Sequence, residues 1–135
     1  MDILFKEEYL KKLKYSDGEW FVNIDELDDS VEVYIQGDYK EADKYYIELA
    51  DKILRNYEKH KATALDRLKN WLPYKESYSC DTIDFCNYEY GSGRSFVGFK
   101  MNFKRDCKGY NDIYTNYTIK FKEDGWPIGL EMWFD

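Results

Sequence analysis

The chain has 135 residues, of which 44% are hydrophobic and 19% aromatic, and it carries a formal net charge of -7. This length fits a single domain over residues 1–135, and the many aromatic residues are enough for a hydrophobic core. The composition therefore argues against a disordered acidic tail. The negative charge disfavours nucleic-acid binding, because phosphate backbones attract basic surfaces.

The charge imbalance lies in one segment of the chain. Residues 16–48 hold eleven acids and two lysines, a local net charge of -9, whereas the segments on either side are nearly balanced. A concentrated negative field attracts a basic partner over about 8 Å, the Debye length at physiological salt. The alternative interpretation is a solvated acidic turn, which is the usual role of a charge run.

The chain shows no targeting signal. Its start, residues 1–8, lacks the basic region and the apolar run of a signal peptide, and no segment reaches the roughly 20 apolar residues of a membrane span. Cys80, Cys86 and Cys107 form an odd set, which argues against a secreted disulfide framework. We expect a cytoplasmic protein with reduced thiols.

The first elements form a predicted hairpin. Residues 3–13 could be a short helix that turns into a strand near Lys14 and Tyr15, and periodicity does not separate the two. After a turn at Asp17 and Gly18, apolar and polar residues alternate over 19–24 and again over 31–36. This period of two predicts two antiparallel strands joined by an acidic loop over residues 25–30.

A helical segment follows the hairpin. Asp38 with Glu41 matches a capping box, which predicts a helix start. Apolar residues then recur every three to four positions from Ala42 to Leu72, directly before Pro73. The polar interval 58–61 is the point where this helix could bend or divide in two.

The C-terminal half predicts a further sheet. Strand patterns recur near residues 82–90, 95–103, 113–121 and 128–134. The fold class is therefore α+β: an antiparallel β-sheet, made of the N-terminal hairpin and a C-terminal meander, packed on one long or broken central α-helix.

One sheet surface should remain uncovered, because a single helix shields only part of one face. The alternate positions should point toward that surface: Glu19, Phe21, Glu32, Tyr34, Phe96, Tyr114, Glu131 and Trp133. Aromatic rings among acids suit a contact surface, since rings supply binding energy and charge governs the rate of approach. Alternatively, these rings pair across strands and only stabilise the sheet.

No catalytic or cofactor motif is present. His60, the one histidine, lies on the predicted helix without a nucleophile beside it in sequence, and it is far from the cysteines that a zinc site would need. Residues 91–95 lack the Gly-Lys-Ser/Thr ending of a phosphate loop. We expect no metal, no cofactor and no enzymatic activity. A small hydrolase that uses carboxylates would need a pocket where acids converge with raised pKa values.

Three features together resemble a known group of proteins: the hairpin with Trp20 and residues 31–35, the helix over residues 42–72, and the ending over residues 117–134. They are similar to small bacterial α+β immunity proteins, which are encoded beside polymorphic or contact-dependent toxins. The resemblance implies a cytoplasmic protein that binds and neutralises a cognate toxin domain, often a basic nuclease. It implies no catalytic residues.

The resulting hypothesis is a non-enzymatic inhibitor of this type. The acids of the loop and of the second strand steer a basic partner, while two aromatic residues anchor it; the predicted partner-binding residues are Phe21, Asp25, Glu26, Asp28, Asp29, Glu32 and Tyr34. The partner is a protein, not nucleic acid or a membrane, and the chain is a monomer or a weak homodimer. The alternative is a general interaction or structural domain of unknown partner, dimeric through an exposed edge strand.

Overall fold

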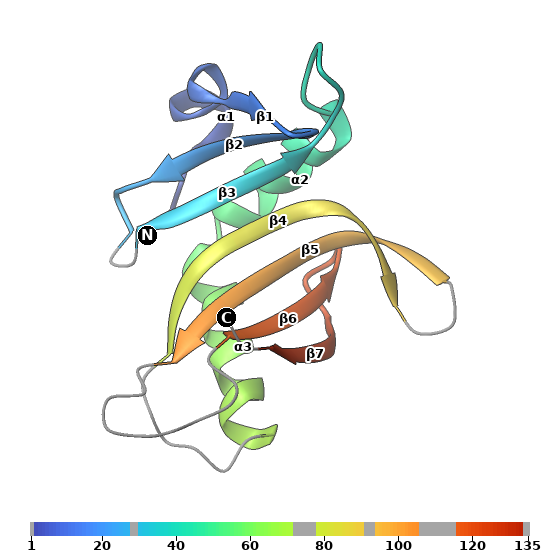
Figure 1. Cartoon of the computed structure of the whole chain (residues 1–135). Coiled ribbons are helices and arrows are strands. Elements are labelled where there is room, and N and C mark those ends of the chain that lie inside the picture. The colour runs from blue at the N-terminus through green and yellow to red at the C-terminus, as the bar shows by residue number, and fades with distance from the viewer. Residues whose placement is uncertain (1, 28–29, 72–77, 91–93, 106–115, 134–135) are drawn as a thin grey trace.

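The fold is α+β and is built on one seven-stranded, mostly antiparallel sheet. The computed structural model describes residues 2–27, 30–71, 78–90, 94–105 and 116–133 (Figure 1). The strands lie in the sheet in the order in which they occur in the chain, from β1 at one edge to β7 at the other. The predicted fold class is confirmed at this level.

The N-terminal segment begins with helix and ends in the sheet. Helix α1 (Phe5–Glu8) and the 3₁₀ turn η1 (Leu10–Lys12) lead into strand β1 (Lys14–Ser16). Strands β2 (Glu19–Ile24) and β3 (Val31–Gln36) pair antiparallel, and Phe21 lies opposite Tyr34. In the turn between β1 and β2, Asp17 and Gly18 both have positive φ angles, as expected for a tight hairpin turn.

The helical segment starts later than the capping box predicts. Helix α2 spans Lys44–Leu54, and its N-cap is Asp43, whose side chain accepts a hydrogen bond from the backbone N–H of Tyr45 at 2.9 Å. Asp38 instead closes a turn: its carboxylate accepts from the N–H groups of Lys40 and Glu41 at 2.9 and 3.0 Å. Both aspartates satisfy the chemistry of a cap, so the sequence signal pointed to the wrong one.

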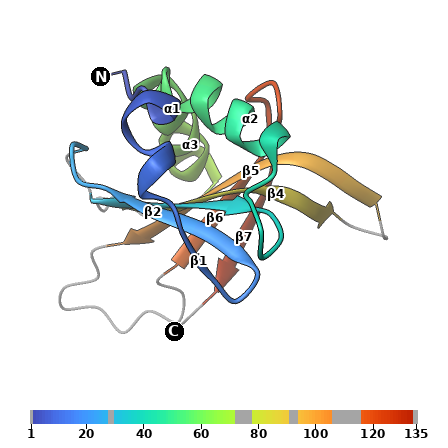
Figure 2. The ribbon, with the colours of Figure 1, turned by 90° about the horizontal axis from the view of Figure 1, so that it is seen from above.

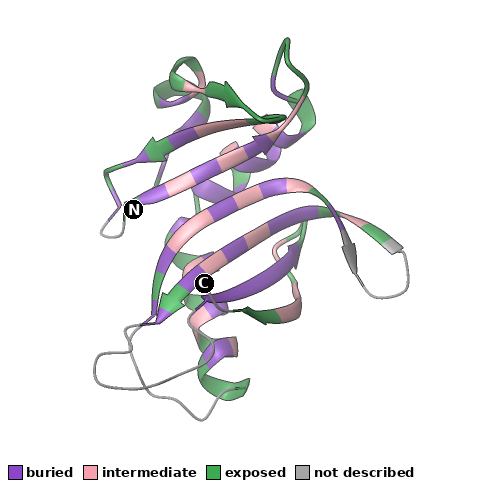
Figure 3. Ribbon diagram, in the orientation of Figure 1, coloured by how far each residue is buried: buried purple, intermediate pink, exposed green. Residues whose placement is uncertain are grey.

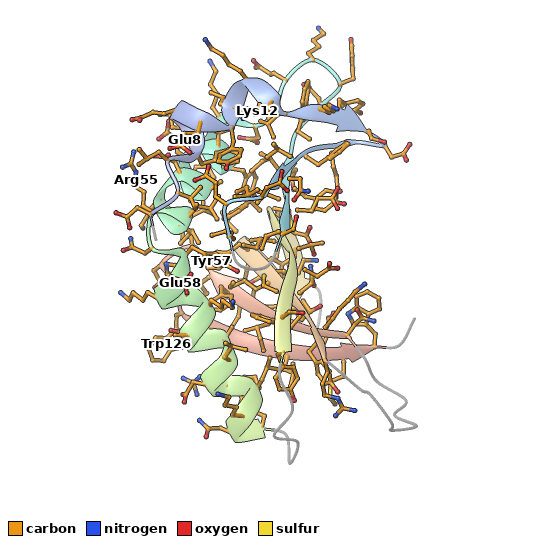
Figure 4. The ribbon with its side chains drawn as sticks, turned by 90° about the vertical axis from the view of Figure 1, so that its left-hand side faces the viewer. Glu8, Lys12, Arg55, Tyr57, Glu58 and Trp126 are labelled. Carbon is orange, nitrogen blue, oxygen red and sulfur yellow. The ribbon has the colours of Figure 1, made fainter. Side chains whose placement is uncertain are left out.

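The break in the helical segment also differs from the expectation. Helix α3 spans Tyr57–Trp71, so the break falls at Arg55 and Asn56, before the polar interval 58–61 and not within it. Figure 4 labels Arg55, which lies in this break, and Tyr57, with which α3 begins. Tyr57 is buried while residues 58 and 59 are exposed, so the polar residues form the outer face of α3.

Four strands make up the rest of the sheet. They are β4 (Tyr78–Tyr90), β5 (Arg94–Arg105), β6 (Asn116–Lys122) and β7 (Pro127–Trp133), and each pairs antiparallel with the next. Strands β3 and β4 are parallel, and helices α2 and α3 form the crossover between them. A parallel pair requires such a long connection, whereas antiparallel neighbours need only a short turn.

The helices leave one face of the sheet open. Helices α1, α2 and α3 lie on the same side of the sheet (Figure 2), behind it in the view of Figure 1. The hydrophobic core fills the space between these helices and the sheet. Its fully buried residues include Ile35, Leu54, Phe85, Phe99 and Phe121. Buried and partly exposed residues alternate along β3 and along most of β4 and β5 (Figure 3), so every second side chain of these strands belongs to the open face, whereas the β6 residues from Asn116 to Phe121 are all buried.

No helix in the described part of the chain combines the length and the apolar character that crossing a membrane requires.

Candidate functional site

The strand register brings aromatic and acidic side chains together on the open face. Phe21 on β2 lies opposite Tyr34 on β3, and Tyr34 lies opposite Asp84 on the parallel strand β4. Glu19 and Glu32 belong to the same face, because they are separated from Phe21 and Tyr34 by two positions. They lie on the face of the sheet opposite to helices α1, α2 and α3 (Figure 1).

A hollow of about 290 Å³ lies at this end of the open face. We call it the acidic hollow, and it is lined by Ser16, Asp17, Glu19, Phe21, Glu32 and Tyr34. Three of its lining residues are acids, and none is a base. The rings of Phe21 and Tyr34 form one wall, with centroids 6.1 Å apart and planes inclined by 33°. The hollow thus combines negative charge with aromatic surface, the combination that favours a cationic side chain.

The acids affect the ionisation of the groups in this hollow. Burial and the hydrogen bond with Glu32 raise the pKa of Tyr34 to about 12, so its hydroxyl keeps its proton at neutral pH. Burial, and then the nearby charge of Asp84, raise the pKa of Glu19 above its ordinary value. Ionising Glu19 therefore costs free energy in the folded protein. Shifted pKa values of this kind are common at functional sites.

A second hollow of about 450 Å³ adjoins the first one and shares Tyr34 with it. We call it the polar hollow, and its other lining residues are Asp81, Thr82, Asp84, Lys100, Asn102, Lys104, Asn116, Thr118, Glu131 and Trp133. Asn102 is its hydrogen-bonding centre: the amide nitrogen donates to Asp84 at 3.1 Å, and the amide oxygen accepts from the Thr118 hydroxyl at 2.5 Å. The indole N–H of Trp133 donates to the same hydroxyl at 3.1 Å.

Charges of both signs meet in the polar hollow, and most of them are paired. Lys120 forms an ion pair with Glu131, and Lys104 lies 3.7 Å from Asp81. Burial raises the pKa of Asp84, while its hydrogen bond with Asn102 and the charge of Lys100 act in the opposite direction. This network ties β4, β5, β6 and β7 together on the open face and gives that surface a fixed shape.

The structure brings together only some of the predicted partner-binding residues. Phe21, Glu32 and Tyr34 all line the acidic hollow. Asp25 accepts a hydrogen bond from the Ser30 hydroxyl at 3.2 Å, within the loop between β2 and β3. Asp28 and Asp29 lie outside the described residues.

Glu26 is directed elsewhere. It accepts a hydrogen bond from the hydroxyl of Tyr9, which belongs to the buried core beside α1. This bond, followed by one with Glu8, lowers the pKa of Glu26, and the proximity of Glu26 raises the pKa of Glu8. Figure 4 shows Glu8 on the helical side of the molecule. The acidic loop therefore connects to two different surfaces.

Sequence patterns missed part of the site. Alternation predicts that Glu19 lies on the open face but does not mark it as a binding residue, and the sequence indicates only a turn at Asp17. Asp84 and Asn102 could have been assigned to one sheet face from the alternation in their strands. Their position beside Tyr34 depends on the parallel pairing of β3 with β4, which leaves no local signal in the sequence.

The remaining reactive groups are the histidine and the cysteines. His60 is buried, with its ring 5.7 Å from Phe99 and 6.5 Å from Phe121, so it packs between α3 and the sheet. Cys80 is buried and its thiol donates a weak hydrogen bond to the Thr82 carbonyl at 3.8 Å, Cys86 is half-buried near Lys100 and Asp84, and Cys107 lies outside the described residues. Among the residues that the structure describes, no group of His, Cys, Asp and Glu side chains could hold a metal ion.

In comparisons with known proteins, no family model, no curated protein and no solved structure matches this chain.

Proposed function

We propose that this protein is a non-enzymatic inhibitor of the immunity type, which binds a basic toxin domain in the cytoplasm through the open face of its sheet. The observation that carries the proposal is the acidic hollow, where three carboxylates and no base surround the Phe21–Tyr34 ring pair. Its lining residues on β2 and β3 belong to the face of the sheet that α2 and α3 leave uncovered.

The two kinds of side chain have different roles in this proposal. The rings supply contact area with few rotatable bonds, and a lysine or arginine of the partner can stack on them. The carboxylates of Asp17, Glu19 and Glu32 select a partner of opposite charge and accelerate its approach. Asp25 and the neighbouring acids of the loop add to the attracting field from the rim.

The first experiment is affinity capture with an N-terminal tag from a lysate of the source organism, at low and at high salt. The proposal expects one basic protein, retained at low salt, whose association with the purified chain is then measured by stopped flow. Glu32→Lys should slow association severalfold, because it reverses a charge in the hollow. Phe21→Ala should mainly speed dissociation, because it removes contact area without changing the charge.

A matched control separates these effects from the change in net charge. Asp66 is an exposed acid on α3, on the far side of the sheet, and Asp66→Lys changes the net charge as much as Glu32→Lys does. If both variants slow association equally, the acidic hollow is not the contact site. Reversing Asp28 and Asp29 to lysine tests the loop in the same way, and unchanged association would exclude it from the interface.

The polar hollow supports a second candidate function, a hydrolase that uses carboxylates. Asp84 combines two features that a general acid needs, a pKa raised by burial and a place in a hollow. This candidate expects hydrolysis of a substrate from an ester, phosphoester or glycoside panel, and loss of that activity in Asp84→Asn. Absence of turnover across the panel would leave the inhibitor as the better explanation.

A further inference from the structure

The two edges of the sheet differ in length and in charge. Strand β1 has three residues and includes Lys14, whereas β7 has seven residues, of which Glu131 is the one charged residue. Glu131 forms an ion pair with Lys120 on the neighbouring strand β6. Among the described residues, none pairs with the outer edge of β7, so its outward backbone N–H and C=O groups are available to another strand.

Exposed apolar side chains accompany this free edge. Met132 and Trp133 are 43% and 45% exposed, and Trp126, in the turn before β7, is 62% exposed and projects beside α3 (Figure 4). The other large exposed hydrophobic residues in the described part of the chain are scattered over α2, α3, β1 and β5 and the connection before α2. Edges of natural sheets usually carry charges that prevent pairing, and β7 has little such protection.

We propose that β7 is a self-association edge, at which a second copy of this chain adds its own β7 in antiparallel orientation. The distribution of charge favours a second copy of the chain at this edge. Two copies with a net charge of -7 repel each other over most of their surface, but the one acid of β7 itself, Glu131, is already paired with Lys120 of its own chain. The acidic hollow lies toward the opposite edge, so pairing through β7 leaves it accessible in both copies.

Self-complementarity fixes the register of the pairing. A two-fold axis through Leu130 sets Leu130 opposite its own copy, Ile128 opposite Met132, and Gly129 opposite Glu131. Apolar side chains then meet apolar ones, and no two carboxylates face each other. An axis through Glu131 would instead place two glutamates directly opposite, which is unfavourable. An axis through Leu130 also pairs all seven residues of β7 with the other copy, from Pro127 opposite Trp133 inward, which an axis through Gly129 does not. The Leu130-centred register is therefore the one that we infer.

Sedimentation velocity of the full chain over a wide concentration range tests the association. The inference expects a monomer–dimer equilibrium that Met132→Lys abolishes, because the new charge meets the apolar side chain of Ile128 from the other copy. Met132 is exposed, so this variant should fold, which circular dichroism will verify. Tyr15→Lys, at an exposed position on the β1 edge, is the matched control and should dimerise like the parent chain.

Cysteine crosslinking tests the register. Under oxidising conditions Leu130→Cys should give a disulfide-linked dimer, and Glu131→Cys should give no more than the parent chain with its own three cysteines. If Leu130→Cys fails to fold, the double variant Ile128→Cys, Met132→Cys replaces it. A monomer at every concentration, a dimer that survives Met132→Lys, or preferential crosslinking at residue 131 would overturn the inference.

Discussion

At the scale of single residues, the buried histidine makes stability depend on pH. His60 is 8% exposed, and an added Cβ at Gly125 would lie only 2.7 Å from its ring. Burial, and then the charges of Lys59 and Lys52, lower the pKa of His60 below its ordinary value of 6.5. The folded state therefore holds a neutral imidazole in an apolar setting beside Phe99 and Phe121.

The sign of the effect follows from linkage. Above pH 6.5 the histidine is neutral in both the folded and the unfolded chain, so it contributes no pH dependence. Below that value the unfolded chain takes up a proton more readily, and the free energy of unfolding decreases. Urea denaturation at about pH 7.5 and about pH 5.5 should show this loss in the parent chain and a smaller loss in His60→Leu. Equal losses in both proteins would show that His60 does not contribute.

One glycine is required by the close approach of two strands. A Cβ added to Gly98 on β5 would lie 2.0 Å from the backbone carbonyl oxygen of Phe121 on β6. Because backbone cannot move aside as a flexible side chain can, Gly98→Ala should lower the free energy of unfolding by about 2–4 kcal/mol. Chemical denaturation measures the change.

A second glycine provides the control. Gly18 has a φ of +87°, and an added Cβ would meet nothing within 4 Å. Gly18→Ala should therefore cost only the backbone strain of a left-handed conformation, about 1 kcal/mol. If Gly18→Ala is as destabilising as Gly98→Ala, the contact between β5 and β6 is looser than the structure indicates.

At the scale of elements, the start of α2 shows how two similar signals compete. Asp43 caps the helix through Tyr45, while Asp38 closes the preceding turn. Asp43→Ala should lower the free energy of unfolding by about 1 kcal/mol, and Asp43→Asn should restore most of it, because asparagine is also a good N-cap. Thermal denaturation followed by circular dichroism measures both variants. Full stability in Asp43→Ala would indicate that the helix begins elsewhere.

The same segment explains which parts of the fold could be predicted. The strands were visible because apolar and polar residues alternate along them, and the apolar stripe of α2 and α3 was visible because it recurs every three to four residues. Which of Asp38 and Asp43 caps α2 depends on tertiary contacts, such as the hydrogen bond from the Asp43 N–H to the carbonyl of Gln36 at the end of β3. Such contacts have no local pattern.

The candidate site was predictable to a similar extent. Alternation along β2 and β3 was enough to place Phe21, Glu32 and Tyr34 on one face. Periodicity does not tell which strands become neighbours, so the position of Asp84 beside Tyr34 could not be read from the sequence. Charge density alone also treated Glu26 as part of the same surface, although a hydrogen bond from Tyr9 draws it toward the helical side.

At the scale of the whole molecule, the acids of the open face oppose folding while they favour the proposed binding. Glu19 lies near Asp84, and both carboxyl groups have raised pKa values because burial disfavours their charged forms. A carboxyl group whose pKa is raised in the folded state destabilises the fold at neutral pH, and the lost stability returns as the pH falls through that pKa. Functional surfaces often carry such a cost.

Glu19→Gln separates these two effects in one variant. Removing the charge should raise the urea midpoint at neutral pH, because glutamine is less costly to bury than a carboxylate and does not repel Asp84. The same change should slow association with a basic partner, because one of three carboxylates in the acidic hollow is lost. Glu41→Gln, at an exposed position outside the acidic hollow, is the control and should change neither quantity appreciably. A variant that gains stability and keeps its association rate would show that Glu19 has no role in binding. A higher urea midpoint together with slower association would show that the carboxylate which destabilises the fold also promotes binding.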